Sequence, residues 1–511
     1  MKYSDGTCCN RSESWSKLQL VVVAVYALIV VVCGLSIICR RRAMTMPAVA
    51  NGEISSDGGP TSPLIEETSP SPRSPVPLNA WSYLRCLARM SLIMLFIFLC
   101  DRTTMFMKEN KWFTYFNFFL PICYLGALGI FFTENSAQTG FLHREQSDEW
   151  KGWMQLVILT YHITGASSKL WIYMIIRIFV SSYLFLTGYG HFTYFFTTGD
   201  YSLRRVLSVL FRYNFFTALL CLTMARPYQF YYFVPLISFW FLMCYFTMAL
   251  PPRVSAASCE SNSVHFFYVI LKFVALFALV SVLYLSEVFF ESLFVMRPWR
   301  HLFVFPAGSV QEWWFRWKLD RYSAPAGMIF GFVVHVCRQQ SILRDAQPFN
   351  VFSKRLTITS VIFSLVGVGG YVGFVYSCRS KKDCNEIHSY VSWIGIISYI
   401  LLRNVFGSAR KHVSTLFGWF GKISLELFIA QYHIWLAADT HGVLVMFPRW
   451  PVFNVILTSL IFICVAHEIH QLTQIFIPIL VPSEMRILIR NFVIFLLLIL
   501  PAGFLYDHVT F

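Results

Sequence analysis

Two histidines stand where apolar helices are expected to cross a membrane, and each follows a lysine and a second polar residue at the same spacing. The first series is Lys151, Gln155 and His162, and the second series is Lys422, Glu426 and His433. At about 100° per residue, the positions of each series fall within roughly 40° of one another, so each series is expected to line one helix face. Ionisable groups are costly in hydrocarbon and usually mark a functional site in a bundle interior. The two series therefore predict a reaction centre inside a membrane.

The chemistry expected of such histidines is proton or acyl transfer. A neutral imidazole suits general-base work on a sugar hydroxyl, and it can also carry an acyl group itself. The alternative is structural, because a lone intramembrane histidine commonly donates a hydrogen bond to a backbone carbonyl or to a neighbouring helix. Two independent structural histidines need not share one spacing. We therefore interpret His162 and His433 as the candidate catalytic residues.

The remaining members of the two series, together with one neighbour, are candidates for holding an acyl donor. Each lysine precedes its histidine by 11 residues, which is about 16 Å along a helix. The lysines either extend to lipid headgroups or bind the phosphates of a donor that enters from the cytosol. Asp148 continues the His162 face by one turn, whereas Glu149 points elsewhere and is expected to be a solvated loop charge. The donor-binding candidates are Lys151, Lys422, Asp148, Gln155 and Glu426.

A polar, tryptophan-rich segment offers a second kind of site. Glu312, Arg316 and Asp320 follow one another at intervals of one helical turn, with tryptophans between them. One interpretation is an interfacial helix anchored by aromatic rings, with local ion pairs. The other is a carbohydrate platform on the lumenal side, since indole faces and fixed charges suit sugar rings and hydroxyls. The substrate-binding candidates are Trp313, Trp314, Trp317, Asp320 and Arg321.

Other charged residues in apolar surroundings are expected to be structural. Arg177 and Arg212 lie inside expected spans, where they need polar partners in the bundle. Asp101 and Arg102 close a span and are interpreted as an interfacial ion pair. The chain has no His-x3-His or Cys-x2-Cys spacing, no Gly-rich phosphate loop and no Gly-x-Ser-x-Gly motif. We therefore expect no metal.

The composition is that of a membrane protein. Of the 511 residues, 57% are hydrophobic and only 13% are charged, far from the average of a soluble domain. Apolar runs of the length that transmembrane helices require recur from Leu18 to the C-terminus. The alternation of a membrane barrel is absent. We predict an all-α polytopic transmembrane helical bundle of about 13–14 spans, one of them at 413–437, with no soluble catalytic domain.

Charged and proline-rich stretches divide the chain into three parts. Residues 1–42 predict a lumenal N-terminus and a signal-anchor helix that ends in three cytosolic arginines. Residues 43–79 are predicted to be a disordered cytosolic linker. Residues 80–511 are predicted to form the multi-spanning domain, in which the loops at 133–151 and 403–412 lie in the cytosol. The net charge of +15 lies in short loops that meet the headgroups of the lipid bilayer, so it does not indicate nucleic acid.

Two further features leave alternatives open. Cys378 and Cys384 flank a hydrophilic loop and form either a small disulfide, if the loop is lumenal, or two unpaired thiols. Asn10 begins a glycosylation sequon that is either used or, because it lies close to the membrane, skipped.

Several long motifs between about residue 83 and the end resemble one family. They are Cys100-Asp-Arg-Thr103, Arg144 to Gln155, Tyr161-His162, Leu186 to Gly190, Asp200 to Arg204, Leu319 to Tyr322, Leu402-Arg-Asn404, Gly421 to Glu426 and Gln431 to Leu436. The family is that of the multi-spanning O-acetyltransferases of fungal capsule synthesis, animal sialate O-acetylation and plant reduced-wall-acetylation proteins. A looser similarity to the bacterial acyltransferase-3 membrane family supports His162 and His433 by analogy only.

One departure from the family bears on partners. Its fungal and animal members carry a lumenal esterase-like domain with a catalytic serine between the first span and the bundle, where this chain has only residues 43–79. In this respect the chain resembles the plant proteins, which are thought to work with separate lumenal transferases. The resemblance thus implies a possible lumenal acetyltransferase partner.

The resemblance implies a multi-pass Golgi membrane O-acetyltransferase or acetyl-transfer component. It would take acetyl from cytosolic acetyl-CoA and pass it to hydroxyls of a lumenal polysaccharide or glycan. His162 would be the acyl-handling or base residue, with His433 its counterpart across the cavity, while Lys151 and Lys422 would engage the donor. The alternative is a transporter that carries an acetyl donor into the Golgi lumen without breaking it.

Overall fold

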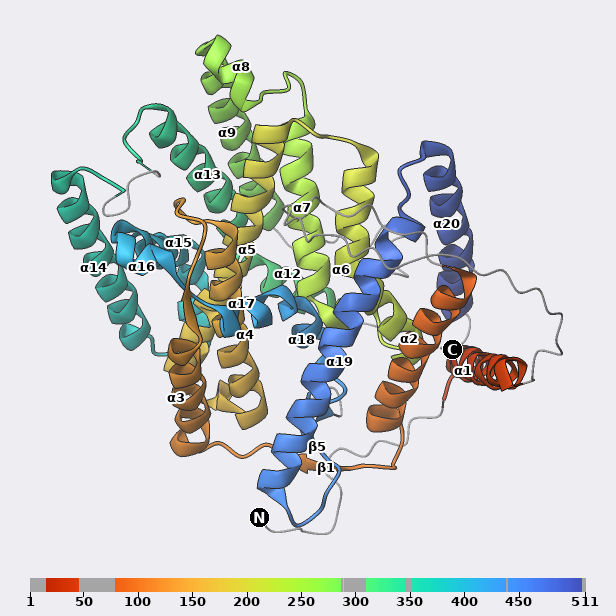
Figure 1. Ribbon diagram of the computed structural model, residues 1–511. Helices are drawn as coiled ribbons and strands as arrows, with labels where there is room; N and C mark the ends of the chain where they lie inside the picture. Colours follow the sequence, from red (N-terminus) through yellow and green to blue (C-terminus); the bar gives the residue numbers. More distant parts are fainter. Residues whose placement is uncertain are drawn as a thin grey trace, which may run out of the picture.

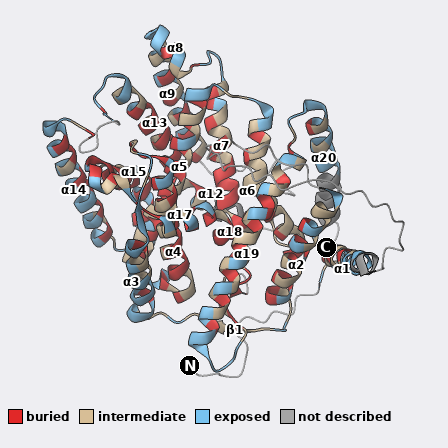
Figure 2. Ribbon diagram, in the orientation of Figure 1, coloured by how far each residue is buried: buried red, intermediate tan, exposed pale blue. Residues whose placement is uncertain are grey.

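A computed structural model describes residues 15–45, 79–285, 288, 309–344, 351–437 and 440–507 of the chain. The sequon at Asn10 and all but the ends of the expected linker at 43–79 lie outside the described residues. Long helices run side by side through most of the molecule, and buried residues concentrate along its middle (Figures 1 and 2).

The first half of the chain forms α1 (Lys17–Thr45), α2 (Ala80–Arg102), α3 (Tyr115–Phe131), α4 (Arg144–Thr164), α5 (Leu170–Thr198), α6 (Leu203–Met224), α7 (Phe233–Ala249), α8 (Ala256–Ser261) and α9 (Val264–Leu285), with 3-10 turns η1 (Ala166–Ser168) and η2 (Tyr228–Tyr231). The second half forms α12 (Ser309–Lys318), α13 (Ser323–Gln339), α14 (Lys354–Ser377), α15 (Lys381–Val405), α16 (Gly407–Lys411), α17 (Thr415–Lys422), α18 (Ser424–Ala430), α19 (Pro451–Leu480) and α20 (Met485–Asp507).

The expected fold class is confirmed. Within the described residues, seven helices are long and apolar enough to cross a membrane: Lys17–Arg40, Ala80–Arg102, Leu170–Thr198, Leu203–Met224, Val264–Leu285, Lys354–Ser377 and Pro451–Leu480. The shorter helices α3 and α7 are also apolar. Peripheral helices such as α1 and α14 carry many exposed residues (Figure 2), and many of these residues are large and apolar, as in helices that face lipid.

Two short antiparallel sheets mark opposite ends of the bundle. At one end β1 (Met107–Asn110) pairs with β5 (Gly442–Val445), and β4 (Leu436–Ala437) pairs with the other edge of β5. At the other end β2 (Thr133–Asn135) pairs with β3 (His412–Ser414). Because α3 connects β1 to β2, we call these the β1–β5 end, at the lower edge of Figure 1, and the β2–β3 end.

The helices that carry the two series pack directly against each other. A Cβ on Gly152 of α4 would lie 1.8 Å from the Phe417 carbonyl oxygen, and a Cβ on Gly421 of α17 would lie 1.8 Å from the Asp148 carbonyl oxygen. Each glycine therefore lets the backbone of the partner helix come into contact, as small residues do in membrane bundles.

We expect Gly421→Ala to destabilise the bundle by about 1–3 kcal/mol, because the added methyl group overlaps the α4 backbone. Gly418→Ala is the matched control on the same helix, since a Cβ there meets nothing within 4 Å and alanine favours helix by up to about 1 kcal/mol. Thermal unfolding in detergent measures both. Equal melting temperatures for the two variants would refute this account of the α4–α17 contact.

The expected span at 413–437 is wrong as a continuous helix. The segment forms α17 up to Lys422, a break at Ile423, the separate helix α18, and then turns that lead into β4. Lys422, Glu426 and His433 therefore do not share one helix face. The break places His433 in a turn, where its side chain meets groups from two other parts of the chain.

Of the two alternatives for the cysteine loop, a disulfide or two unpaired thiols, the structure has the disulfide. Cys378 and Cys384 form a disulfide at the α14–α15 connection. Lys381 in the same connection donates to the Ser167 carbonyl, 2.8 Å away. The disulfide therefore lies near the C-terminus of α4.

Candidate active site

His433 is held between an aspartate and a tyrosine in the interior of the bundle. Its Nδ1 lies 2.6 Å from Oδ2 of Asp101, and its Nε2 lies 2.6 Å from the Tyr231 hydroxyl. The imidazole and the Tyr231 side chain are fully buried. With Asp101 ionised, the ring donates from Nδ1 and accepts the tyrosine hydroxyl at Nε2. This is the aspartate–histidine–hydroxyl arrangement that fixes one tautomer for proton transfer.

Asp101 is placed by the C-terminal turn of α2 and by strand β1. Lys108 of β1 donates to the Asp101 carbonyl oxygen at 2.5 Å, and its Nζ lies 3.7 Å from Oδ1 of the same residue. Arg102, which was expected to form an interfacial ion pair with Asp101, donates to the Met224 carbonyl. The buried carboxylate faces a lysine and an imidazole, which compensates its charge.

His162 lies in the last turn of α4, which ends at Gly165 in the left-handed conformation, with φ 66°. The imidazole is partly exposed and packs edge-on against the Tyr161 ring, with centroids 5.1 Å apart. Among the described residues no side chain or backbone group forms a hydrogen bond with its ring nitrogens. His162 therefore offers two ring nitrogens to a ligand, unlike His433.

The 108–111 segment connects the surroundings of the two histidines. Lys108 contacts Asp101, the partner of His433. Three residues later, the carbon chain of Lys111 packs over Gly165, the C-cap of α4, three residues after His162. Both candidate catalytic residues thus lie toward the β1–β5 end.

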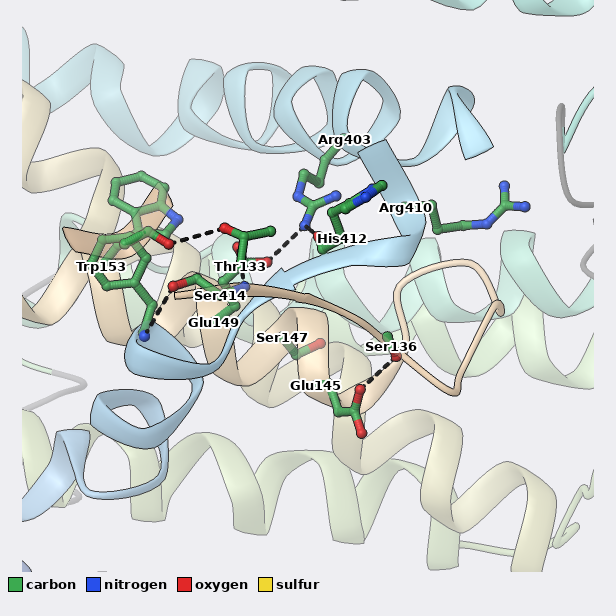
Figure 3. Close-up of polar contacts among 12 residues, drawn as sticks. Thr133, Ser136, Glu145, Ser147, Glu149, Trp153, Arg403, Arg410, His412 and Ser414 are labelled. Carbon is green, nitrogen blue, oxygen red and sulfur yellow. Dashed lines mark hydrogen bonds and ion pairs between the residues drawn. The ribbon is translucent and has the colours of Figure 1, made fainter. Parts of the chain in front are cut away.

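The donor-binding candidates at the start of α4 lie toward the β2–β3 end. The ammonium of Lys151 lies 3.3 Å from Oδ1 of Asp148, and Lys422 is exposed without an ion pair among the described residues. Glu149 is not the solvated charge expected from the sequence. It accepts from Arg403 at 2.8 Å and from the Ser414 backbone N–H at 3.2 Å, which ties α4 to β3 (Figure 3).

Gln155 and Glu426 lie deeper in the bundle. Gln155 accepts weakly from the Tyr183 hydroxyl at 3.4 Å, and its buried Nε2 has no partner in the described part. Glu426 pairs with Arg212 at 2.6 Å and lies 3.3 Å from His470 Nδ1. Arg212 thus has the buried partner that it was expected to need. Among the described residues, Gln155 thus keeps a buried free donor and Lys422 an exposed ammonium, and both groups can contact oxygen atoms of a ligand.

The tryptophan-rich segment is not an exposed platform. Trp317, Asp320 and Arg321 are buried, Trp314 is partly buried, and the side chain of Trp313 lies outside the described part. Asp320 pairs with Arg177 and accepts from Ser181 at 2.5 Å, while Ser181 lies 2.9 Å from His388 Nε2. This cluster forms because Arg177 needs a counter-charge inside the bundle, and Asp320 is the carboxylate that reaches it.

We expect Asp320→Asn to cost about 3–5 kcal/mol, because it leaves the buried Arg177 guanidinium opposite a neutral amide. The double variant Arg177→Met with Asp320→Leu removes both charges and should recover most of the loss. Thermal unfolding of the three proteins in detergent is the measurement. A double variant less stable than Asp320→Asn would show that the ion pair stabilises the bundle directly.

Comparisons with known proteins agree with this arrangement of helices. Residues 1–493 match the family model of the 10 TM acyl transferase domain found in Cas1p. The chain is also similar to an N-acetylneuraminate (7)9-O-acetyltransferase of Danio rerio, with 43% identity over 508 residues. That match covers 98% of this chain and 63% of the relative, so the chain spans less than two thirds of the relative's length. No solved structure matches the chain.

Proposed function

The chain belongs to the family of the 10 TM acyl transferase domain found in Cas1p, and from this we propose that it is a multi-pass Golgi membrane O-acetyltransferase. It takes acetyl from cytosolic acetyl-CoA at the β2–β3 end and passes it to a hydroxyl of a lumenal glycan at the β1–β5 end. The observation that carries the proposal is the buried arrangement in which His433 contacts Asp101 and Tyr231. The segment 108–111 contacts Asp101 through Lys108 and packs beside the α4 C-terminus through Lys111, close to the partly exposed His162 imidazole.

In the proposed reaction the acceptor hydroxyl oxygen attacks the thioester carbonyl carbon. The new C–O bond forms, the C–S bond breaks, and the hydroxyl proton passes to an imidazole and then to the leaving sulfur, which departs as free CoA. His162 is the base in contact with the acceptor, because its ring nitrogens are open. His433, oriented by Asp101, is the second proton-handling imidazole. Lys151, Lys422 and Gln155 hold the donor.

The competing function is a transporter that carries the acetyl donor intact. The two are separated by incubating the purified chain with labelled acetyl-CoA and a glycan. A transferase releases free CoA, whereas a carrier leaves the thioester whole. Intact acetyl-CoA after long incubation, with the label accumulating inside proteoliposomes, would refute the transferase.

We also propose that a separate lumenal acetyltransferase cooperates with the bundle on polysaccharide. In that case the hydroxyl that attacks the thioester beside His162 belongs to this partner, which then passes the acetyl group on to the polysaccharide. The support is the short interval at 43–79, which is too poor in apolar side chains to bury a core. The purified chain is given acetyl-CoA and a soluble glycan without a second protein. Release of CoA without glycan acetylation supports the partner, and robust acetylation by the chain alone contradicts it.

A further inference from the structure

A buried lysine lies behind the carboxylate that orients His433. Lys108 of β1 is 5% exposed, and its ammonium lies 3.7 Å from Oδ1 of Asp101. The ammonium also donates to the Asp101 carbonyl at 2.5 Å, which ties the lysine to the end of α2. The other carboxylate oxygen, Oδ2, lies 2.6 Å from Nδ1 of His433. The carboxylate therefore stands between a cation and the imidazole, and the proposed reaction assigns the cation no step.

A sheet fixes Lys108 relative to the turn that carries His433. Lys108 pairs with Leu444 in the register of β1 with β5. The Leu444 N–H donates to the carbonyl of Trp435, two residues after His433, at 3.1 Å, and β4 then pairs with the other edge of β5. The Leu444 side chain is fully buried beneath this connection. The strand with the lysine and the turn with the histidine are thus one unit, which holds the base of the lysine side chain at a fixed place beside Asp101.

Other titratable side chains lie around the Asp101–His433 pair on the elements that pack against it. The charged ones are Arg102 of α2, Glu109 of β1 and Arg316 of α12, and the uncharged ones are Cys100, Tyr231 and Tyr432. Glu109 projects from the opposite face of the strand to Lys108, because side chains alternate along a strand. These groups are the same in the native chain and in a variant at Lys108, so the effect of the lysine can be measured against them.

The charge of Lys108 affects how strongly the Asp101–His433 pair holds an additional proton. A base accepts the proton of a hydroxyl only while it is neutral. An imidazole beside a carboxylate without a counter-charge is held in its protonated form, because an opposite charge within about 4–6 Å favours the charged state. The Lys108 ammonium offsets the charge of Asp101 and repels a positive charge on the ring. The imidazole is therefore neutral at a lower pH than it would be without the lysine.

We propose that Lys108 is a positioning residue of the acetyl transfer. It acts through Asp101 and keeps His433 neutral, so that the imidazole can take up the hydroxyl proton at Nε2 and release it for transfer to the leaving sulfur. The proposal rests on the proposed function for the use that the reaction makes of this imidazole. The protonation of His433 itself can be measured without turnover.

The test removes the charge of Lys108 and follows the protonation of His433. Lys108→Met keeps most of the carbon chain, and Lys108→Arg keeps a cation at the same position. Lys272→Met is the matched control, because Lys272 is a partly buried lysine whose ammonium donates to the carbonyls of Met248 and Leu250, at 3.1 and 2.6 Å. NMR spectra of the full chain with isotope-labelled histidine rings identify the His433 signals by their loss in His433→Gln and follow them as the pH is raised. The rate of CoA release from acetyl-CoA in the presence of glycan is recorded over the same pH range.

In Lys108→Met, the pH at which His433 becomes neutral is expected to rise by about 1–3 units, the effect of one adjacent charge. The acidic limb of the transfer rate should move up by the same amount, and the rate at alkaline pH should return to near its native value. Lys108→Arg and Lys272→Met should follow the native curves. An unchanged titration of His433 in Lys108→Met would overturn the proposal. A transfer rate lowered equally at every pH would also do so, because the lysine would then only stabilise the sheet.

The outcomes separate this proposal from the proposed function. A shifted His433 titration in a chain that never releases CoA supports the electrostatic role of Lys108 and refutes the transferase. Transfer by a chain whose His433 titration is the same with and without the lysine leaves the transferase standing and overturns the role of Lys108. Lys108→Gln, which is also uncharged, replaces Lys108→Met in both comparisons if the methionine variant does not fold.

Discussion

Asp101→Asn is expected to lower acetyl transfer by about 10²–10⁴-fold with little change in acetyl-CoA binding. The carboxylate accepts the Nδ1–H of His433, 2.6 Å away. An asparagine can present its NH2 group there instead, which turns Nδ1 into an acceptor and moves the ring proton to Nε2. That nitrogen then no longer accepts the Tyr231 hydroxyl. The rate of CoA release in the presence of glycan measures the effect.

The control for this variant is Asp200→Asn, which makes the same change in the loop between α5 and α6. Asp200 accepts from the Tyr194 hydroxyl and from the Ser202 backbone N–H, both at 3.0 Å. It should keep transfer near the native rate. If Asp101→Asn is as active as Asp200→Asn at equal expression, His433 does not act through Asp101.

His162→Ala is expected to reduce acetyl transfer by about 10²–10⁴-fold, the contribution of a positioned general base. The change should leave folding intact, because the ring is partly exposed and has no hydrogen-bond partner among the described residues. Binding of acetyl-CoA should also persist, since the donor-binding candidates lie toward the other end of α4. Transfer rates and acetyl-CoA affinities of the purified proteins test the two halves of this expectation.

His265→Ala is the matched control for His162→Ala. His265 begins α9, where its Nδ1 lies 2.7 Å from the Ser258 carbonyl oxygen. In the described part of the chain its contacts are with Ser258 and the Tyr268 ring, which lie outside the proposed site, so the change should not alter transfer. Native-like acetylation by His162→Ala would remove His162 from the reaction and leave His433 as the candidate base.

The fold class and the helical position of His162 could be predicted from the sequence. Long apolar runs determine helical spans with little ambiguity, since the bilayer leaves few alternatives. The spacing of Lys151, Gln155 and His162 fits a regular helix, and α4 is one. The same spacing before His433 led to a wrong prediction of one continuous helix. Apolar character does not show where a helix breaks, and this segment is interrupted at Ile423 and again by the turns after Ala430.

The partners of the site residues could not be predicted, because they come from distant parts of the chain. From the sequence, Asp101 at the end of α2 was interpreted as an interfacial charge. In the structure it is buried against Lys108 of β1 and against His433. Asp320 read as part of a surface platform because its neighbours are aromatic, yet Arg177 draws it inside. Lys111 carried no signal in the sequence. Only the contact with Gly165 sets it beside His162.

The most direct test of the central claim follows acetyl across the membrane. Sealed Golgi membrane vesicles from cells that express the chain receive acetyl-CoA labelled in the acetyl group on the outside. We predict label esterified to glycan inside and an equal amount of free CoA outside, both lost with His162→Ala and with Asp101→Asn. Intact labelled acetyl-CoA inside the vesicles, at levels unaffected by either substitution, would contradict the account and identify the chain as a carrier.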